Sequence, residues 1–90
     1  MTEARCRRIE ERLSAKFAPT HLLVKDQSHL HAGHAGAKEG KGHFDVHIVA
    51  EAFAGHSRLS RHRLVFDALG DMMESDIHAL KIRAQTPDEA

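Results

Sequence analysis

The chain has 90 residues, a hydrophobic share of 41%, and 13 Lys and Arg side chains that balance 13 Asp and Glu. These values predict one globular domain over residues 1–90 with one modest core, and exclude a disordered chain. Zero net charge argues against strong non-specific nucleic-acid binding, and the single cysteine excludes an internal disulfide. No apolar run reaches the roughly 20 residues that cross a bilayer, and no secretory signal is recognisable. We therefore expect a cytoplasmic protein with no membrane partner.

Residues 3–17 are expected to form an amphipathic helix. Apolar side chains recur there at intervals of three and four residues, at Cys6, Ile9, Leu13 and Phe17. Pro19 ends the helix because its ring is incompatible with helical continuation. We interpret Cys6 as a small half-buried hydrophobic side chain rather than a reactive thiol.

Two strands are expected next, at residues 21–27 and around residues 43–50. The first contains aliphatic residues without a breaker, and the second alternates apolar and polar side chains. Between them, residues 28–42 are rich in Gly, Ala and His, which predicts a long mobile loop.

A second helix is expected after Ser57, with Ser57 or Ser60 as its N-cap and a bend or break near Gly70. Residues 78–85 alternate again and predict a third strand. The order is α-β-β-α-β, in the α+β class. A hairpin joins the first two strands, the third lies parallel to the second, and both helices cover one face of a three-stranded mixed sheet. Residues 1–2 and 87–90 are expected to fray.

The nine histidines are the most unusual feature of the composition. Neutral imidazole is the commonest protein metal ligand, and three of the histidines lie in the predicted loop, at His29, His31 and His34. His78 opens the last strand with the same parity as Leu80, so we expect its ring to point towards the covered face or its rim. The histidines could instead belong to a solvated loop and a structural strand position. Two imidazoles cannot complete the ligand set of a zinc ion or a [2Fe-2S] cluster, so metal binding here requires ligands from a partner.

A basic cluster marks the start of the second helix, at Arg58, Arg61, His62 and Arg63. It is either a phosphate-contacting patch at a helix N-terminus or an ordinary solvated face. The chain has no nucleophile or hydrolase motif, so we do not expect an enzyme. Gly33-His34-Ala35-Gly36 matches the G-x-x-G loop of KH domains, but that loop joins two helices, and we interpret the match as coincidental.

Motifs from Ile9 to Thr86 carry a family resemblance in their order and spacing. They are His29-Leu30-His31-Ala32-Gly33-His34-Ala35-Gly36, His43-Phe44, Glu51-Ala52-Phe53-x-Gly-x-Ser57, Arg61-His62-Arg63-x-Val65-x-x-Ala68-Leu69 and Ile77-His78-Ala79-Leu80. Together they resemble the BolA family. This resemblance implies an α-β-β-α-β domain of class II KH-like topology, with a short extra helical turn before or after the long helix.

The resemblance also implies a function. BolA-like proteins form heterodimers with monothiol (CGFS-type) glutaredoxins and share a bridging [2Fe-2S] cluster, in iron–sulfur trafficking and maturation or in iron sensing. Carried over to this sequence, the ligands from the chain are His34 and His78, with His31 as an alternative to His34. The glutaredoxin cysteine and a glutathione thiol complete the set, and the free chain is a monomer.

Two other functions stay open at this point. Some BolA-like proteins are DNA-binding transcriptional regulators of morphology or stress response, and the matching residues here are Arg58, Arg61, His62 and Arg63. The third interpretation is a small interaction module without a ligand of its own.

Overall fold

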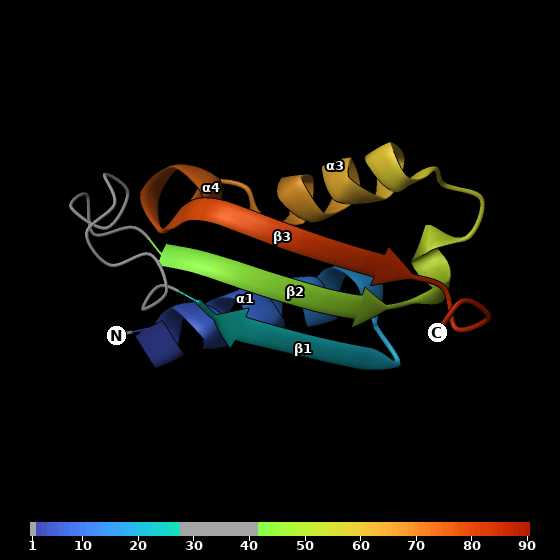
Figure 1. The fold of residues 1–90 in the computed structure, drawn as a ribbon, viewed down its shortest axis with the longest axis horizontal. Helices are drawn as coiled ribbons and strands as arrows, with labels where there is room; N and C mark the ends of the chain where they lie inside the picture. Colours follow the sequence, from blue (N-terminus) through green and yellow to red (C-terminus); the bar gives the residue numbers. More distant parts are fainter. Residues whose placement is uncertain (1, 28–41) are drawn as a thin grey trace.

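The computed structural model describes residues 2–27 and 42–90 (Figure 1). Its elements follow the predicted order, with two short helical segments in addition, one before and one after the second long helix. They are α1 (Thr2–Phe17), β1 (His21–Asp26), β2 (Gly42–Val49), η2 (Glu51–Phe53), α3 (Arg58–Leu69), α4 (Met72–Ser75) and β3 (Ile77–Gln85). Among the described residues, no helix is both long and apolar enough to cross a membrane.

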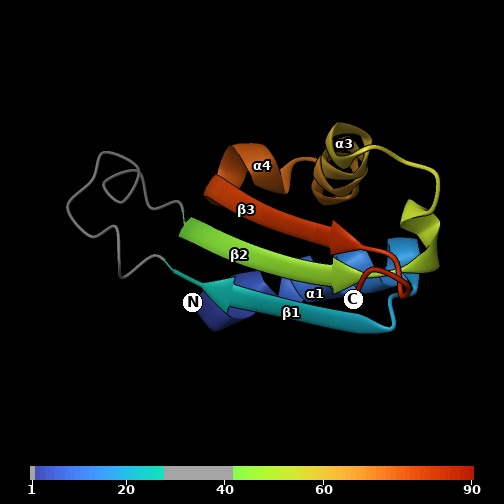
Figure 2. The same cartoon turned by 45° about the vertical axis from the view of Figure 1, so that its right-hand side comes forward.

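The sheet has three strands in the order β1-β2-β3. β1 pairs antiparallel with β2, and β2 pairs parallel with β3. The helices lie on one side and the other face stays open (Figure 2). The predicted α+β fold with a mixed sheet is therefore confirmed.

The core lies between the sheet and the helices. Phe44, Val46 and Ile48 of the central strand are buried, because alternate residues of a strand point to the same face. Ile9 and Leu13 pack against them from α1, and both are fully buried. The apolar stripe predicted for the first helix is therefore its core face.

The ends of α3 follow the predicted signals. The Ser57 side chain accepts a hydrogen bond from the main-chain N–H of Ser60 at 3.1 Å, as an N-cap does. Gly70 ends the helix with φ 51° and ψ −122°, a conformation that L side chains rarely adopt. The expected break near Gly70 is therefore confirmed, and α4 follows as a separate turn.

Both ends of the chain, and the end of the predicted loop at Gly42, are attached to the folded domain. Most of residues 28–42 fall outside the described residues, but Gly42 begins β2. Thr2 already belongs to α1. At the other end, Glu89 accepts hydrogen bonds from the Arg61 side chain and from the main-chain N–H of Thr86. The tail, which we expected to fray, is thus attached to the domain at Glu89.

Candidate functional site

His78 lies at an irregularity in the sheet. Gly42 pairs with Ile77 and the next β2 residue, His43, pairs with Ala79, so His78 is an extra residue of β3 between the two pairs. Such a bulge interrupts the alternation of side chains between the two faces. The orientation that we predicted from parity with Leu80 is therefore wrong, and His78 is exposed rather than directed into the covered face.

The His78 ring packs against a second histidine. The ring centroids of His43 and His78 are 5.1 Å apart, with an angle of 55° between the ring planes. His43 is 7% exposed, so a buried ring supports an exposed one. Sequence reasoning used His43 only as part of a motif, because the bulge that brings the two rings together cannot be read from alternation.

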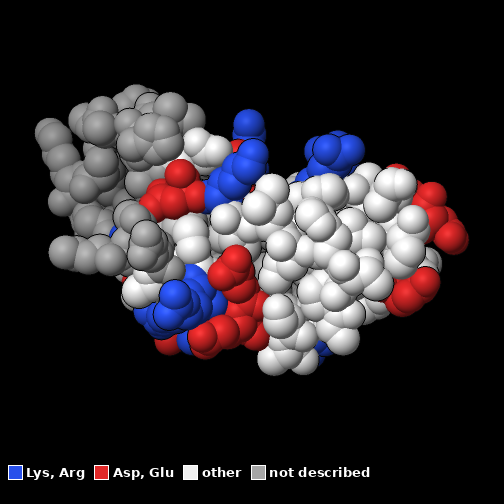
Figure 3. Space-filling model, turned by 90° about the horizontal axis from the view of Figure 1, so that it is seen from below, with Lys and Arg blue, Asp and Glu red and all other residues white. Residues whose placement is uncertain are grey.

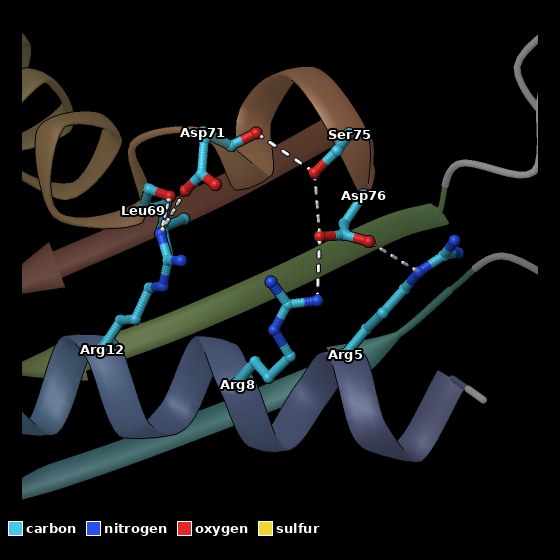
Figure 4. A network of polar contacts seen from close by, with 7 residues as sticks. All are labelled: Arg5, Arg8, Arg12, Leu69, Asp71, Ser75 and Asp76. Carbon is cyan, nitrogen blue, oxygen red and sulfur yellow. Dashed lines mark hydrogen bonds and ion pairs between the residues drawn. The ribbon is translucent and has the colours of Figure 1, made fainter.

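Asp76, which precedes β3, contacts both α1 and β2; Figure 4 shows its contacts with α1. The Asp76 carboxylate accepts a hydrogen bond from Arg8 of α1 at 3.1 Å and lies 3.4 Å from the Nε atom of Arg5. The Asp76 main-chain carbonyl accepts a hydrogen bond from the N–H of Gly42 at 2.9 Å. These contacts fix the chain two residues before His78.

A neighbouring ion pair holds the start of α4. Arg12 donates to the Asp71 carboxylate at 2.9 Å and to the Leu69 carbonyl at 2.5 Å (Figure 4). The hydrogen bond from Arg12, together with its positive charge, lowers the pKa of Asp71. Three arginines of α1 therefore bind both ends of the segment that leads into β3.

The same end of the sheet is where the chain enters and leaves the His-rich segment. The main-chain N–H of Gln27 donates to the His43 carbonyl at 2.8 Å, and Gly42 is held by Asp76. His29, His31 and His34 lie outside the described residues. The structure thus places His78 next to Gly42, at the same end of the sheet as both attachment points of the segment that carries these three histidines.

His78 can supply one ligand to a metal centre, but the described residues around it cannot complete one. The His78 side chain is exposed, so its imidazole is accessible to a ligand-sharing partner. No group of three or more His, Cys, Asp or Glu side chains within residues 2–27 and 42–90 could hold a metal ion. A metal at His78 therefore needs donors from the remaining segment or from another molecule.

The four residues of the basic cluster on α3 differ in exposure and in contacts. Arg58 and Arg63 are exposed, whereas Arg61 donates to the carbonyls of His56 at 2.9 Å and of Ala84 at 3.1 Å. Arg61 also binds both carboxylate oxygens of Glu89. Arg61, one of the candidate phosphate contacts of the alternative interpretation, therefore also attaches the C-terminal tail to α3.

The ion pair between Arg61 and Glu89 shifts the pKa values of both residues. The hydrogen bond from Arg61, followed by that from the main-chain N–H of Thr86, lowers the pKa of Glu89 to about 2. The same pair raises the pKa of Arg61. His62 is half-buried, so Arg58 and Arg63 are the exposed cations of the predicted patch.

Charged side chains are unevenly distributed over the surface that is seen from below in Figure 3. Seen from below, acidic and basic side chains crowd together at one end, and a broad area in the middle has none of either sign.

The uncovered sheet face carries a second histidine pair, His21 and His47, with ring centroids 4.9 Å apart. The structure therefore separates two histidine pairs, of which only His43–His78 lies at the His-rich segment.

Comparison with known proteins places this arrangement in a family. The profile of the BolA-like protein family matches residues 13–89. SufE-like protein 1 of Arabidopsis thaliana is 45% identical over 87 residues, which are 91% of this chain and 24% of that protein. The DNA-binding transcriptional regulator BolA of Escherichia coli is 38% identical over 82 residues, 91% of this chain and 75% of that protein.

A solved structure agrees with these matches. The BolA domain of SufE1 from Arabidopsis thaliana superimposes with a TM-score of 0.86 at 45% identity, over 96% of this chain and 95% of that one. The chain spans about a quarter of SufE-like protein 1 and 57% of Arabidopsis BOLA1. Profile, sequence and fold agree over nearly the whole length, so the chain belongs to the BolA family.

Proposed function

We propose that this chain is a non-enzymatic adaptor that binds a monothiol glutaredoxin and shares a bridging [2Fe-2S] cluster with it. Its role is cytoplasmic iron–sulfur trafficking and maturation, or iron sensing. One observation carries the proposal: an exposed imidazole at a sheet bulge lies at the end of the sheet where the chain enters and leaves the His-rich segment. Family membership supports it, because the BolA resemblance implied this partner and this cluster.

The residues present fit such a group. His78 supplies one imidazole nitrogen and His34 a second, with His31 as the alternative to His34. The glutaredoxin cysteine and a glutathione thiol supply two sulfurs, so the ligands have the His₂Cys₂ composition of Rieske centres. When bound, the cluster supplies iron and sulfide for transfer, or a redox-active centre for sensing.

The chain itself positions the ligand and leaves it accessible. The buried ring of His43 limits the orientations of the His78 ring, and the contacts of Asp76 fix the preceding main chain. Because His78 is exposed, a second protein can approach it without unfolding the domain. Ligand residues held this way lose little conformational freedom when a cluster binds.

The DNA-binding interpretation has less support in this chain. The name of the Escherichia coli relative describes a DNA-binding regulator. Here Arg61 is bound to Glu89 and to two carbonyls, which leaves Arg58 and Arg63 as exposed cations on the predicted helix face. With zero net charge in the whole chain, few phosphates would be neutralised.

Co-expression with a monothiol glutaredoxin tests the adaptor proposal. We expect an anaerobically purified heterodimer whose visible absorption and circular dichroism differ from those of either protein alone, and whose assembly requires glutathione. His34→Ala and His31→Ala, prepared separately, identify the ligand from the segment, because only one of them should change the spectrum. A heterodimer without visible absorption, or no heterodimer at all, would contradict the proposal.

A further inference from the structure

A groove of about 580 Å³ crosses the uncovered side of the sheet and continues over the edge of β3 to the start of α3. Outer-face side chains of all three strands line it, and Arg58 and His62 of α3 form its far wall. Leu80 and Ile82 of β3, whose side chains pack against the core on the covered face, also line it at the edge of the strand. This surface lies next to the His78 site but shares no residue with the proposed ligand set.

The edge of β3 inside this groove is open. The Gln85 carbonyl accepts from Ala50 on the β2 side, whereas the Ala84 carbonyl accepts from Arg61 on the opposite side. Alternate residues of a strand direct their main-chain groups to opposite edges, so Leu80 and Ile82 direct theirs outward, as Ala84 does. Among the described residues, neither Leu80 nor Ile82 has a partner for these groups on that side.

The open edge has a defined length. Arg61 covers it at Ala84, and the bulge at His78 interrupts it at the other end. Between these limits the main-chain groups of Leu80 and Ile82 lie about 6.6 Å apart along the strand, at 3.3 Å per residue. An extended segment of about four residues fits this stretch.

The groove is basic. Lys25, Arg58, Lys81 and Arg83 line it, with Asp45 as the single carboxylate. The adjoining part of the groove contains Glu89, but Arg61 already binds that carboxylate. An occupant that carries several negative charges is therefore complementary to this surface.

We infer that this groove binds an extended acidic peptide, which adds as a fourth strand to the edge of β3. Main-chain hydrogen bonds to Leu80 and Ile82 supply affinity, and acidic side chains next to Arg58, Lys81 and Arg83 supply specificity. A single-stranded nucleic acid fits less well. No Phe, Tyr or Trp lines either part of the groove, so base stacking there would depend on the smaller imidazole rings and on arginine side chains.

The first test uses a fluorescent peptide of sequence Glu-Val-Glu-Val-Glu-Val-Glu and its counterpart with Lys in place of Glu. In anisotropy titrations at low ionic strength, the acidic peptide should bind at least about tenfold more tightly. Arg83→Glu should weaken its binding by about tenfold, and Arg58→Glu should act in the same direction. Arg63→Glu is the matched control, since Arg63 is exposed on the same helix but does not line the groove, and it should change binding by less than about twofold.

The second test asks whether the peptide binds as a strand. Two acidic peptides are N-methylated at odd or at even positions, because only one set of amides can face β3. One set should lose about tenfold in affinity and the other should bind as the parent does. Equal effects of the two sets, no saturable binding of the acidic peptide, or tighter binding of an oligothymidylate of equal charge would each overturn the inference.

Discussion

The contacts of Asp76 should contribute measurably to the stability of the domain. The Asp76 side chain is 15% exposed and pairs with Arg8 at 3.1 Å and with Arg5 at 3.4 Å. Ser75 donates a further hydrogen bond from its hydroxyl to the same carboxylate. Ion pairs near a surface contribute about 0.2–1 kcal/mol each, and one hydrogen bond adds about 0.5–1.5 kcal/mol. Asp76→Ala should therefore lower the free energy of unfolding by about 1.5 kcal/mol.

For a domain of this size that loss corresponds to a decrease in Tm of roughly 6–12 °C, which calorimetry or circular dichroism can measure. Asp71→Ala is the matched control, because the Asp71 side chain is 76% exposed and Arg12 keeps the Leu69 carbonyl as a partner. It should lower the Tm by less than half as much. In 1 M NaCl the difference between the two variants should shrink, since salt screens exposed charges. An equal effect of the two substitutions would show that the contacts of Asp76 contribute no more to stability than those of the exposed Asp71.

Three further predictions concern the tail, the helix break and DNA. Because Arg61 lowers the pKa of Glu89 from 4.5 to about 2, the contribution of Glu89 to stability is complete above pH 4.5 and is lost as the pH falls towards 2. In a pH series of urea unfolding, wild type should lose its advantage over Glu89→Gln across that range, and a constant difference would contradict this. Gly70→Ala should lower the unfolding free energy by about 1–3 kcal/mol, although an added Cβ meets no close neighbour, and an unchanged value would show that the backbone conformation is not strained for alanine. If the chain binds duplex DNA through Arg58 and Arg63, the plot of log K against log salt concentration should have a slope no steeper than about −2, and a steeper slope would show further phosphate contacts.

Much of the fold follows from local patterns in the sequence. The 3.6-residue period of Ile9 and Leu13 and the alternation around Val46 depend on neighbours along the chain, so they predict both the elements and their buried faces. The N-cap at Ser57 and the break at Gly70 are also local, because each depends on a residue type with a specific backbone role. Their agreement with the structure has this common cause.

The features that sequence reasoning missed depend on pairing between distant segments. The orientation of His78 is set by the register of β3 against β2, and a bulge of one residue reverses any prediction from parity. Arg8 and Asp76 are 68 positions apart, and Arg61 and Glu89 are 28 apart. Composition shows that these charged residues exist, but only the folded chain decides which of them pair and which stay accessible.

Comparison of His78→Ala with His21→Ala tests whether His78 is a cluster ligand. Both histidines are exposed and both pack against a second histidine, at 5.1 Å and 4.9 Å between ring centroids. Each substitution removes one ring contact, so both should cost less than about 1.5 kcal/mol of stability. The measurement is the visible circular dichroism of each chain in complex with a monothiol glutaredoxin and glutathione. We predict that His78→Ala abolishes or reshapes the cluster spectrum, whereas His21→Ala leaves it as in wild type. An unchanged spectrum for His78→Ala would show that His78 is not a ligand of the cluster.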